Sequence, residues 1–76
     1  MKNSIWYAVM RNRDDSDWGY GSHEIKEAIR MAESLEDDEA YIAVIDESKN
    51  DPFCIGEIWR DEDGEWTNDS TPHYNI

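Results

Sequence analysis

The sequence predicts an α+β fold: a single small domain in the order β-α-β-β-β, with one helix packed on one face of a three- to four-stranded sheet. Only one stretch of the chain has helical periodicity, and short apolar runs of strand length flank it. The 76 residues leave room for one hydrophobic core, to which nine aromatic residues can contribute large buried areas. The domain is expected over residues 1–67, followed by a flexible C-terminal tail over 68–76.

The first half of the chain predicts a strand, a loop and the helix. Residues 5–10 (Ile-Trp-Tyr-Ala-Val-Met) are β-branched, aromatic or apolar and contain no Gly or Pro, which predicts a strand. Residues 14–21 hold three aspartates and two glycines, a composition typical of a turn-rich loop. Apolar residues recur at spacings of three and four over 25–35, which predicts a helix there, and Ser22 can cap its N-terminus. The helix should end at residue 35 or 36.

Three further strands are predicted in the second half. Residues 41–45 are a continuous apolar run, which is typical of a central strand. Residues 53–60 form the next strand, in which Gly56 marks a bulge or a close backbone approach. A turn over 61–64 then leads into a short strand at 65–67.

The predicted sheet has two apolar faces, but only one helix is available to cover them. The runs 5–10 and 41–45 carry apolar residues on both faces, whereas one helix covers only one face. A right-handed crossover is expected if these two strands lie side by side and parallel. The second face therefore needs a cover, which a symmetric homodimer, a protein target or the folded-back tail could supply.

The formal net charge of −12 lies entirely in the second part of the chain. Residues 1–30 hold five acids and five bases, whereas residues 31–76 hold fourteen acids and two bases. A field of this kind attracts cationic partners and repels phosphate, so direct nucleic-acid binding is not expected.

Two groups of acids are candidates for a partner-binding surface, one at the helix end and one at the tip of the last hairpin. Negative charge at the carbonyl end of a helix costs about 0.3–1 kcal/mol per group, so local stability does not account for the first group. If both groups lie on one side, they imitate a nucleic acid backbone and fit a basic groove. The alternative is that they only make the domain soluble. The candidates are Glu33, Glu36, Asp37, Asp38, Glu39, Asp61, Glu62, Asp63 and Glu65.

We therefore expect a non-catalytic inhibitor or adaptor that binds the basic surface of a nucleic-acid-binding protein. In size and charge the chain resembles phage-encoded anti-CRISPR and other anti-defence proteins, a resemblance that rests on no motif and assigns no residue. The alternative function is a self-associating accessory or protein-interaction domain that uses the uncovered sheet face and the Trp18 loop.

The loop over 14–21 is the other candidate binding site. Large aromatics set among aspartates and glycines are common in recognition loops. Trp18 could instead fold back over the sheet as a lid on the core. The candidate residues of this loop are Asp14, Asp15, Asp17, Trp18 and Tyr20.

No metal, cofactor or catalytic site is expected. An EF-hand frame that begins at Asp14 lacks two ligand positions, and Cys54, His23 and His73 are too far apart in the sequence for a zinc motif. Cys54 lies in an apolar run, which predicts a small buried side chain. A single cysteine, no signal peptide and no membrane-spanning run together predict a cytoplasmic protein without a membrane segment.

Overall fold

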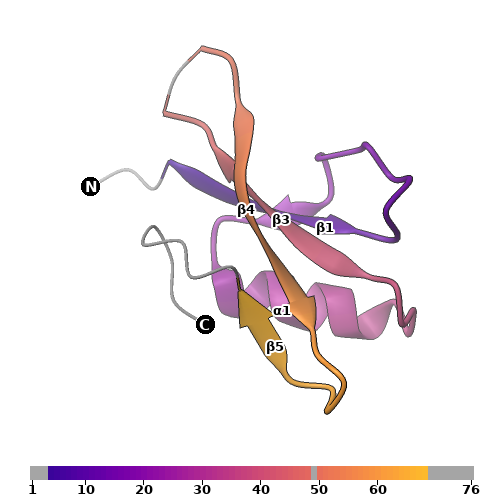
Figure 1. Cartoon of the computed structure of the whole chain (residues 1–76). Coiled ribbons are helices and arrows are strands. Elements are labelled where there is room, and N and C mark those ends of the chain that lie inside the picture. Colours follow the sequence, from indigo (N-terminus) through magenta and orange to yellow (C-terminus); the bar gives the residue numbers. More distant parts are fainter. Residues whose placement is uncertain (1–3, 49, 69–76) are drawn as a thin grey trace.

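The computed structural model describes residues 4–48 and 50–68 of the chain. One helix lies against a five-stranded sheet whose strand order is β2-β1-β3-β4-β5 and whose pairs are all antiparallel (Figure 1). The elements are β1 Ile5–Met10, β2 Gly21–Ser22, α1 Ile25–Ser34, β3 Tyr41–Asp46, β4 Phe53–Arg60 and β5 Trp66–Asn68. The predicted α+β class with a single helix is confirmed.

β1 and β3 are neighbours in the sheet, but they run in opposite directions. Ile5 lies opposite Asp46 and Met10 opposite Tyr41, so the expected crossover between parallel strands is wrong. The reason is β2, a two-residue strand that the sequence pattern did not predict. After the loop the chain turns back along β1, pairing Ser22 with Tyr7, so α1 carries it towards the Met10 end of β1 and β3 enters antiparallel.

The helix has nearly its predicted length but a different N-terminal residue. Glu24 is the N-cap and makes no side-chain capping bond, whereas Ser22 belongs to β2. The Oγ atom of Ser22 accepts a hydrogen bond from the Glu24 N–H at 3.1 Å, one step before the helix begins. Ala28 and Ala32 are fully buried against the sheet, so close packing of small side chains positions α1.

Each face of the sheet carries its own apolar cluster. The cluster under α1 is formed by Tyr7, Val9, Ala28, Ala32, Ile42, Val44 and Ile58. The cluster on the opposite face, here called the second face, is formed by Ala8, Met10, Tyr41, Ala43 and Ile45, with Trp6 and Trp59 packed against it.

The loop after β1 covers part of the second face. The Cζ atom of Arg13 lies 4.0 Å from the ring centroid of Tyr41, and Nη1 of Arg13 lies 2.7 Å from Oε1 of Glu57. A further contact joins the start of β1 to the same loop, because Nε1 of Trp6 donates to the carbonyl oxygen of Trp18 at 2.7 Å. The chain itself thus supplies some of the cover that the sequence assigned to a partner or to the tail.

A bulge lies in β4 at the predicted place. Val44 pairs with Gly56 and Ile45 with Cys54, which leaves Ile55 as the extra residue. The prediction that Cys54 is buried was wrong: its side chain is exposed, and its Sγ atom hydrogen-bonds to the Gly56 carbonyl at 3.2 Å. The reason is that Cys54 lies opposite Ile45, which belongs to the cluster of the second face, so α1 on the other face cannot cover it.

The structure describes only the first residue of the predicted tail. Asn68 is the last residue of β5, and residues 69–76 lie outside the described residues. Across residues 4–48 and 50–68, no helix has the length and apolar character that crossing a membrane requires.

Replacing Gly21 with alanine should destabilise the fold. A Cβ atom at Gly21 would approach the Tyr7 carbonyl oxygen far inside 3.0 Å, a distance that real Cβ atoms essentially never show, and the backbone cannot yield without breaking the β1–β2 pair. We expect a loss of about 1–3 kcal/mol in the free energy of unfolding, measured by urea denaturation. Gly19→Ala is the matched control, because the nearest atom there belongs to the flexible side chain of Asp17. Equal losses in both variants would contradict this account.

Candidate functional site

Three acidic segments that are far apart in the sequence meet at one end of the sheet. β1 ends at Met10, β3 begins at Tyr41 and β4 ends at Arg60, and antiparallel pairing places these three points together. The loop after β1, the link between α1 and β3, and the β4–β5 turn all leave the sheet there (Figure 1). We call this region the acidic end; its carboxylates are Asp14, Asp15, Asp17, Glu33, Glu36, Asp37, Asp38, Glu39, Asp61, Glu62, Asp63 and Glu65.

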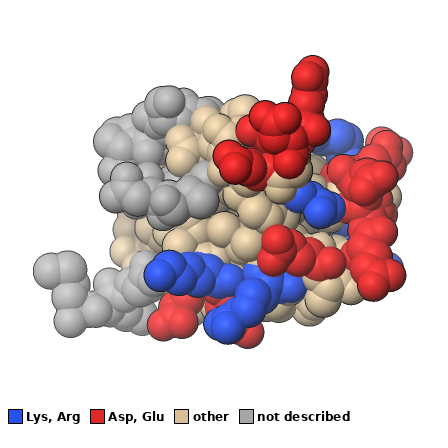
Figure 2. Space-filling view, turned by 90° about the horizontal axis from the view of Figure 1, so that it is seen from below, with Lys and Arg blue, Asp and Glu red and all other residues tan. Residues whose placement is uncertain are grey.

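The acidic end is not uniformly negative. In the view from below, Asp and Glu side chains gather along the upper and right-hand parts of the surface, with blue groups between them, and Lys and Arg side chains lie across the lower left (Figure 2). The same segments that carry the acids also carry Arg11, Arg13 and Arg60. The surface is therefore a set of neighbouring acidic patches divided by arginines.

Arg60 holds the last hairpin against the end of the helix. Its Nη2 atom donates to the carbonyl oxygen of Asp37 at 2.8 Å, and its guanidinium lies 5.3 Å from the ring centroid of Trp66. Nε1 of Trp66 in turn donates to Oε2 of Glu33 at 3.4 Å. The last turn of α1 has no basic residue, so Arg60 supplies the positive charge that the carbonyl end of a helix favours.

Four aspartates of the acidic end shape the backbone. Each accepts hydrogen bonds from main-chain N–H groups two or four residues away, the arrangement by which short carboxylate side chains build turns. Asp15 accepts from Arg11 at 3.0 Å and Asp17 at 3.0 Å, and Asp61 accepts from Asp63 at 2.9 Å and Glu65 at 3.0 Å. The four are Asp15, Asp17, Asp37 and Asp61.

The remaining acids of the helix-end link and the hairpin tip have no such role. Within the described ranges of the chain, no side-chain hydrogen bond or ion pair involves the carboxylates of six exposed residues of these two segments. They are Glu36, Asp38, Glu39, Glu62, Asp63 and Glu65. A basic partner could contact these carboxylates without disturbing a turn.

Glu36 occupies a backbone conformation that favours glycine. Its φ angle is 54°, in the left-handed region, directly after the helix C-cap Leu35. Its N–H donates to the Glu33 carbonyl at 3.2 Å, which closes the last turn of the helix. A Cβ atom is unfavourable in this backbone conformation, and a carboxylate is unfavourable beside the negative end of the helix dipole.

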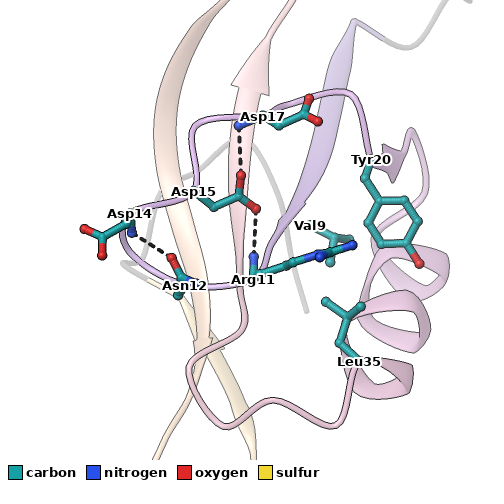
Figure 3. Close-up of a pocket in the computed structure, with 8 residues that line it drawn as sticks. All are labelled: Val9, Arg11, Asn12, Asp14, Asp15, Asp17, Tyr20 and Leu35. Atoms are coloured by element: carbon teal, nitrogen blue, oxygen red, sulfur yellow. Dashed lines mark hydrogen bonds between the residues drawn. The ribbon is translucent and has the colours of Figure 1, made fainter.

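The loop after β1 borders an open pocket of about 650 Å³ at the acidic end. Figure 3 shows the Arg11 side chain extending towards Tyr20, beside Val9 and above Leu35, whereas the carboxylate of Asp14 points away. In the described part of the chain, no group of three or more His, Cys, Asp or Glu side chains is placed to hold a metal ion.

Trp18 is tied to the sheet through its backbone, and its side chain remains partly exposed. Its carbonyl oxygen is bound by Trp6, which ties the loop to the sheet, yet 38% of its surface is exposed. Its side chain lines a groove on the second face together with Trp6, His23 and Glu47. Sequence reasoning did not single out Trp6 as a site residue, although its alternation with Ala8 and Met10 put these three residues on one face of the strand.

Replacing Glu36 with glycine should stabilise the protein. Glycine adopts the left-handed conformation without the steric cost that a Cβ atom brings, so we expect a gain of about 0.5–1 kcal/mol in the free energy of unfolding. Urea denaturation measures it. Glu36→Gln removes the charge but keeps the Cβ atom, and a gain in this variant as large as in Glu36→Gly would assign the effect to charge alone.

Asp15 should make the stability of the fold depend on pH in acid. The backbone N–H groups of Asp17 and Arg11 bind its carboxylate and hold its pKa below the ordinary value of 3.8. Because the folded-state pKa is the lower one, the ionised group stabilises the native state above pH 3.8, and this contribution is lost as the pH falls through the lowered pKa.

The Asp15→Asn variant tests this dependence. We expect it to be less stable than the wild type at neutral pH and to approach it below pH 3.8, in urea denaturation at matched ionic strength. A stability difference that stays constant over this range would contradict the assignment.

Comparisons of the chain with protein-family models, with curated proteins and with solved structures found no match. The function is therefore inferred from the contacts and charges described above.

Proposed function

We propose that this is a non-catalytic binding protein whose acidic end occupies the basic groove of a nucleic-acid-binding protein, as an inhibitor or adaptor that takes the place of nucleic acid. The observation that carries the proposal is the convergence of three acidic segments at one end of the sheet. The contacts of Arg60 with Asp37 and Trp66 support it, because they hold two of these segments against each other.

The rigidity of the acidic end favours mimicry over simple solubility. A groove that holds duplex DNA meets about one negative charge per 1.7 Å of helix axis, at positions fixed by the duplex. Carboxylates on flexible segments would lose conformational entropy on binding such a groove. Here Asp37 and Asp61 use their own side chains to fix the turns that carry Asp38, Glu39, Glu62 and Asp63.

Two of the three arginines of the acidic end are already engaged with the chain itself. Arg13 pairs with Glu57 and covers Tyr41, and the hydrogen bond to Glu57 raises the pKa of Arg13 above its ordinary value. Arg60 binds the Asp37 carbonyl. Both guanidinium groups thus have partners within the fold, and the exposed carboxylates around them remain for a basic surface.

Phage or mobile-element anti-defence proteins such as anti-CRISPR proteins are the class that this proposal favours, on the basis of size and charge. Such an inhibitor would act in the cytoplasm, on a protein that handles nucleic acid there. It would need no cofactor and no bound nucleic acid of its own.

Self-association through the second face is the second candidate function. An exposed aromatic side chain on that face favours it, because Trp18 is 38% exposed and lines the same groove as Trp6 and Ile45. Self-association was inferred because the second face needs a cover, but Met10, Tyr41 and Ile45 on that face are already buried within one chain. A homodimer stays a prediction, and the mass from light scattering at high protein concentration decides it.

Reversing two exposed carboxylates should abolish capture of the basic partner. We expect the Asp38→Lys/Asp63→Lys variant to weaken binding at least about tenfold, because attraction becomes repulsion where the groove is basic. Affinity capture from lysate with quantitative mass spectrometry identifies the partner, and calorimetry with that partner measures the loss. The wild-type affinity should also fall steeply as the salt concentration rises.

The matched control is Glu24→Lys/Asp51→Lys, which makes the same change in net charge. Glu24 precedes α1 and Asp51 lies in the β3–β4 turn, so both are exposed and away from the acidic end. Equal weakening by both pairs would show that only net charge matters. Salt-independent binding would refute the proposal.

A further inference from the structure

A groove on the second face is lined by two tryptophans, apolar residues and one carboxylate. Its volume is about 330 Å³, and Trp6, Trp18, His23 and Pro52 form its walls with Glu47. Ile45, which is 1% exposed, belongs to its floor. The Trp6 and His23 rings meet edge to face, with their centroids 4.8 Å apart, and Oε1 of Glu47 lies 3.8 Å from Nε2 of His23.

This combination of groups favours a cation over a neutral ligand. The faces of indole rings attract ammonium and guanidinium groups, and a carboxylate beside them adds a charge-assisted hydrogen bond. An apolar ligand would instead remove Glu47 from water without giving it a partner of opposite charge, which is unfavourable. The strongly negative net charge of the chain also favours a cationic ligand.

The fold contains an internal example of the same chemistry. Arg13 places its guanidinium 4.0 Å from the Tyr41 ring centroid while its Nη1 atom lies 2.7 Å from the Glu57 carboxylate. An aromatic face beside a glutamate thus accommodates an arginine on this same face of the sheet. In the described part of the chain, the rings that carry an arginine are Tyr41 and Trp66, and neither Trp6 nor Trp18 has a Lys or Arg over it.

We propose that the groove between Trp6 and Trp18 binds an arginine side chain of a protein partner, with the guanidinium against the indoles and paired with Glu47. A guanidinium suits this site better than an ammonium, because it is planar, stacks on aromatic faces and is weakly hydrated. The inference goes beyond the proposed function, since it concerns another surface and stands whether or not the acidic end imitates nucleic acid.

The test is a titration of the intact protein with the blocked peptide acetyl-Gly-Arg-Gly-amide, followed by NMR of the indole N–H groups. Trp6 is a sensitive reporter, because its Nε1–H already binds the Trp18 carbonyl at the rim of the groove. We expect saturable shifts of the Trp6 and Trp18 indole signals. Glu47→Gln should weaken binding about three- to fivefold, and Trp18→Leu by a similar factor.

Two further peptides and one variant make the result decisive. Citrulline has nearly the shape of arginine without its charge, so its peptide should give no saturable shift; equal binding of the citrulline or lysine peptide overturns the proposal. The Asp38→Lys/Asp63→Lys variant should bind the arginine peptide with at most a small loss, whatever its effect on the basic partner. No shift with the arginine peptide, or unchanged affinity in Glu47→Gln, also overturns the proposal.

Discussion

β3 is buried on both faces, and the rest of the molecule is arranged around that requirement. Its residues from Tyr41 to Ile45 are all buried, so a sheet built around it must be covered twice. One helix serves the first face. On the second face the loop after β1 contributes, with Arg13 lying over the Tyr41 ring and reaching the Glu57 carboxylate. In so short a chain a charged side chain thus acts as a cover, with its guanidinium against the Tyr41 ring.

This second cover has a consequence for the acidic end. The loop that covers part of the second face also carries Asp14, Asp15 and Asp17, so the contacts that anchor it to the core also fix the position of these acids. The link between α1 and β3 and the β4–β5 turn are fixed in another way, by the contacts of Arg60. Arg13 and Arg60 therefore both stabilise the fold and hold the acidic segments in place.

The sequence predicted those parts of the fold that depend on composition along the chain. The helix, β1, β3, β4, the Gly64 turn and the bulge beside Gly56 lie where periodicity and residue type placed them. β2 could not be predicted, because a Gly-Ser pair becomes a strand only through its approach to Tyr7 and Ala8. Because β2 turns the chain back along β1, the antiparallel direction of β3 could not be predicted either.

The candidate site, like the fold, could be predicted only in part from the sequence. The acidic groups are evident from the sequence alone, and so is their conflict with the helix dipole. Their arrangement depends on contacts between residues far apart in the chain, such as Arg60 with Asp37 and Trp66 with Glu33, which no local pattern encodes. Likewise, composition could not separate the aspartates that build turns from the acids that remain exposed.

The convergence of acidic segments at one end also gives the molecule a lopsided charge distribution along its length. Lys26 and Arg30 lie on α1, outside the loop, link and turn that form the acidic end, so the two ends differ in potential. A positively charged target would exert a torque on such an electric dipole before the surfaces touch. Productive encounters would then be enriched over random collisions, and the gain would appear in the association rate constant more than in the lifetime of the complex.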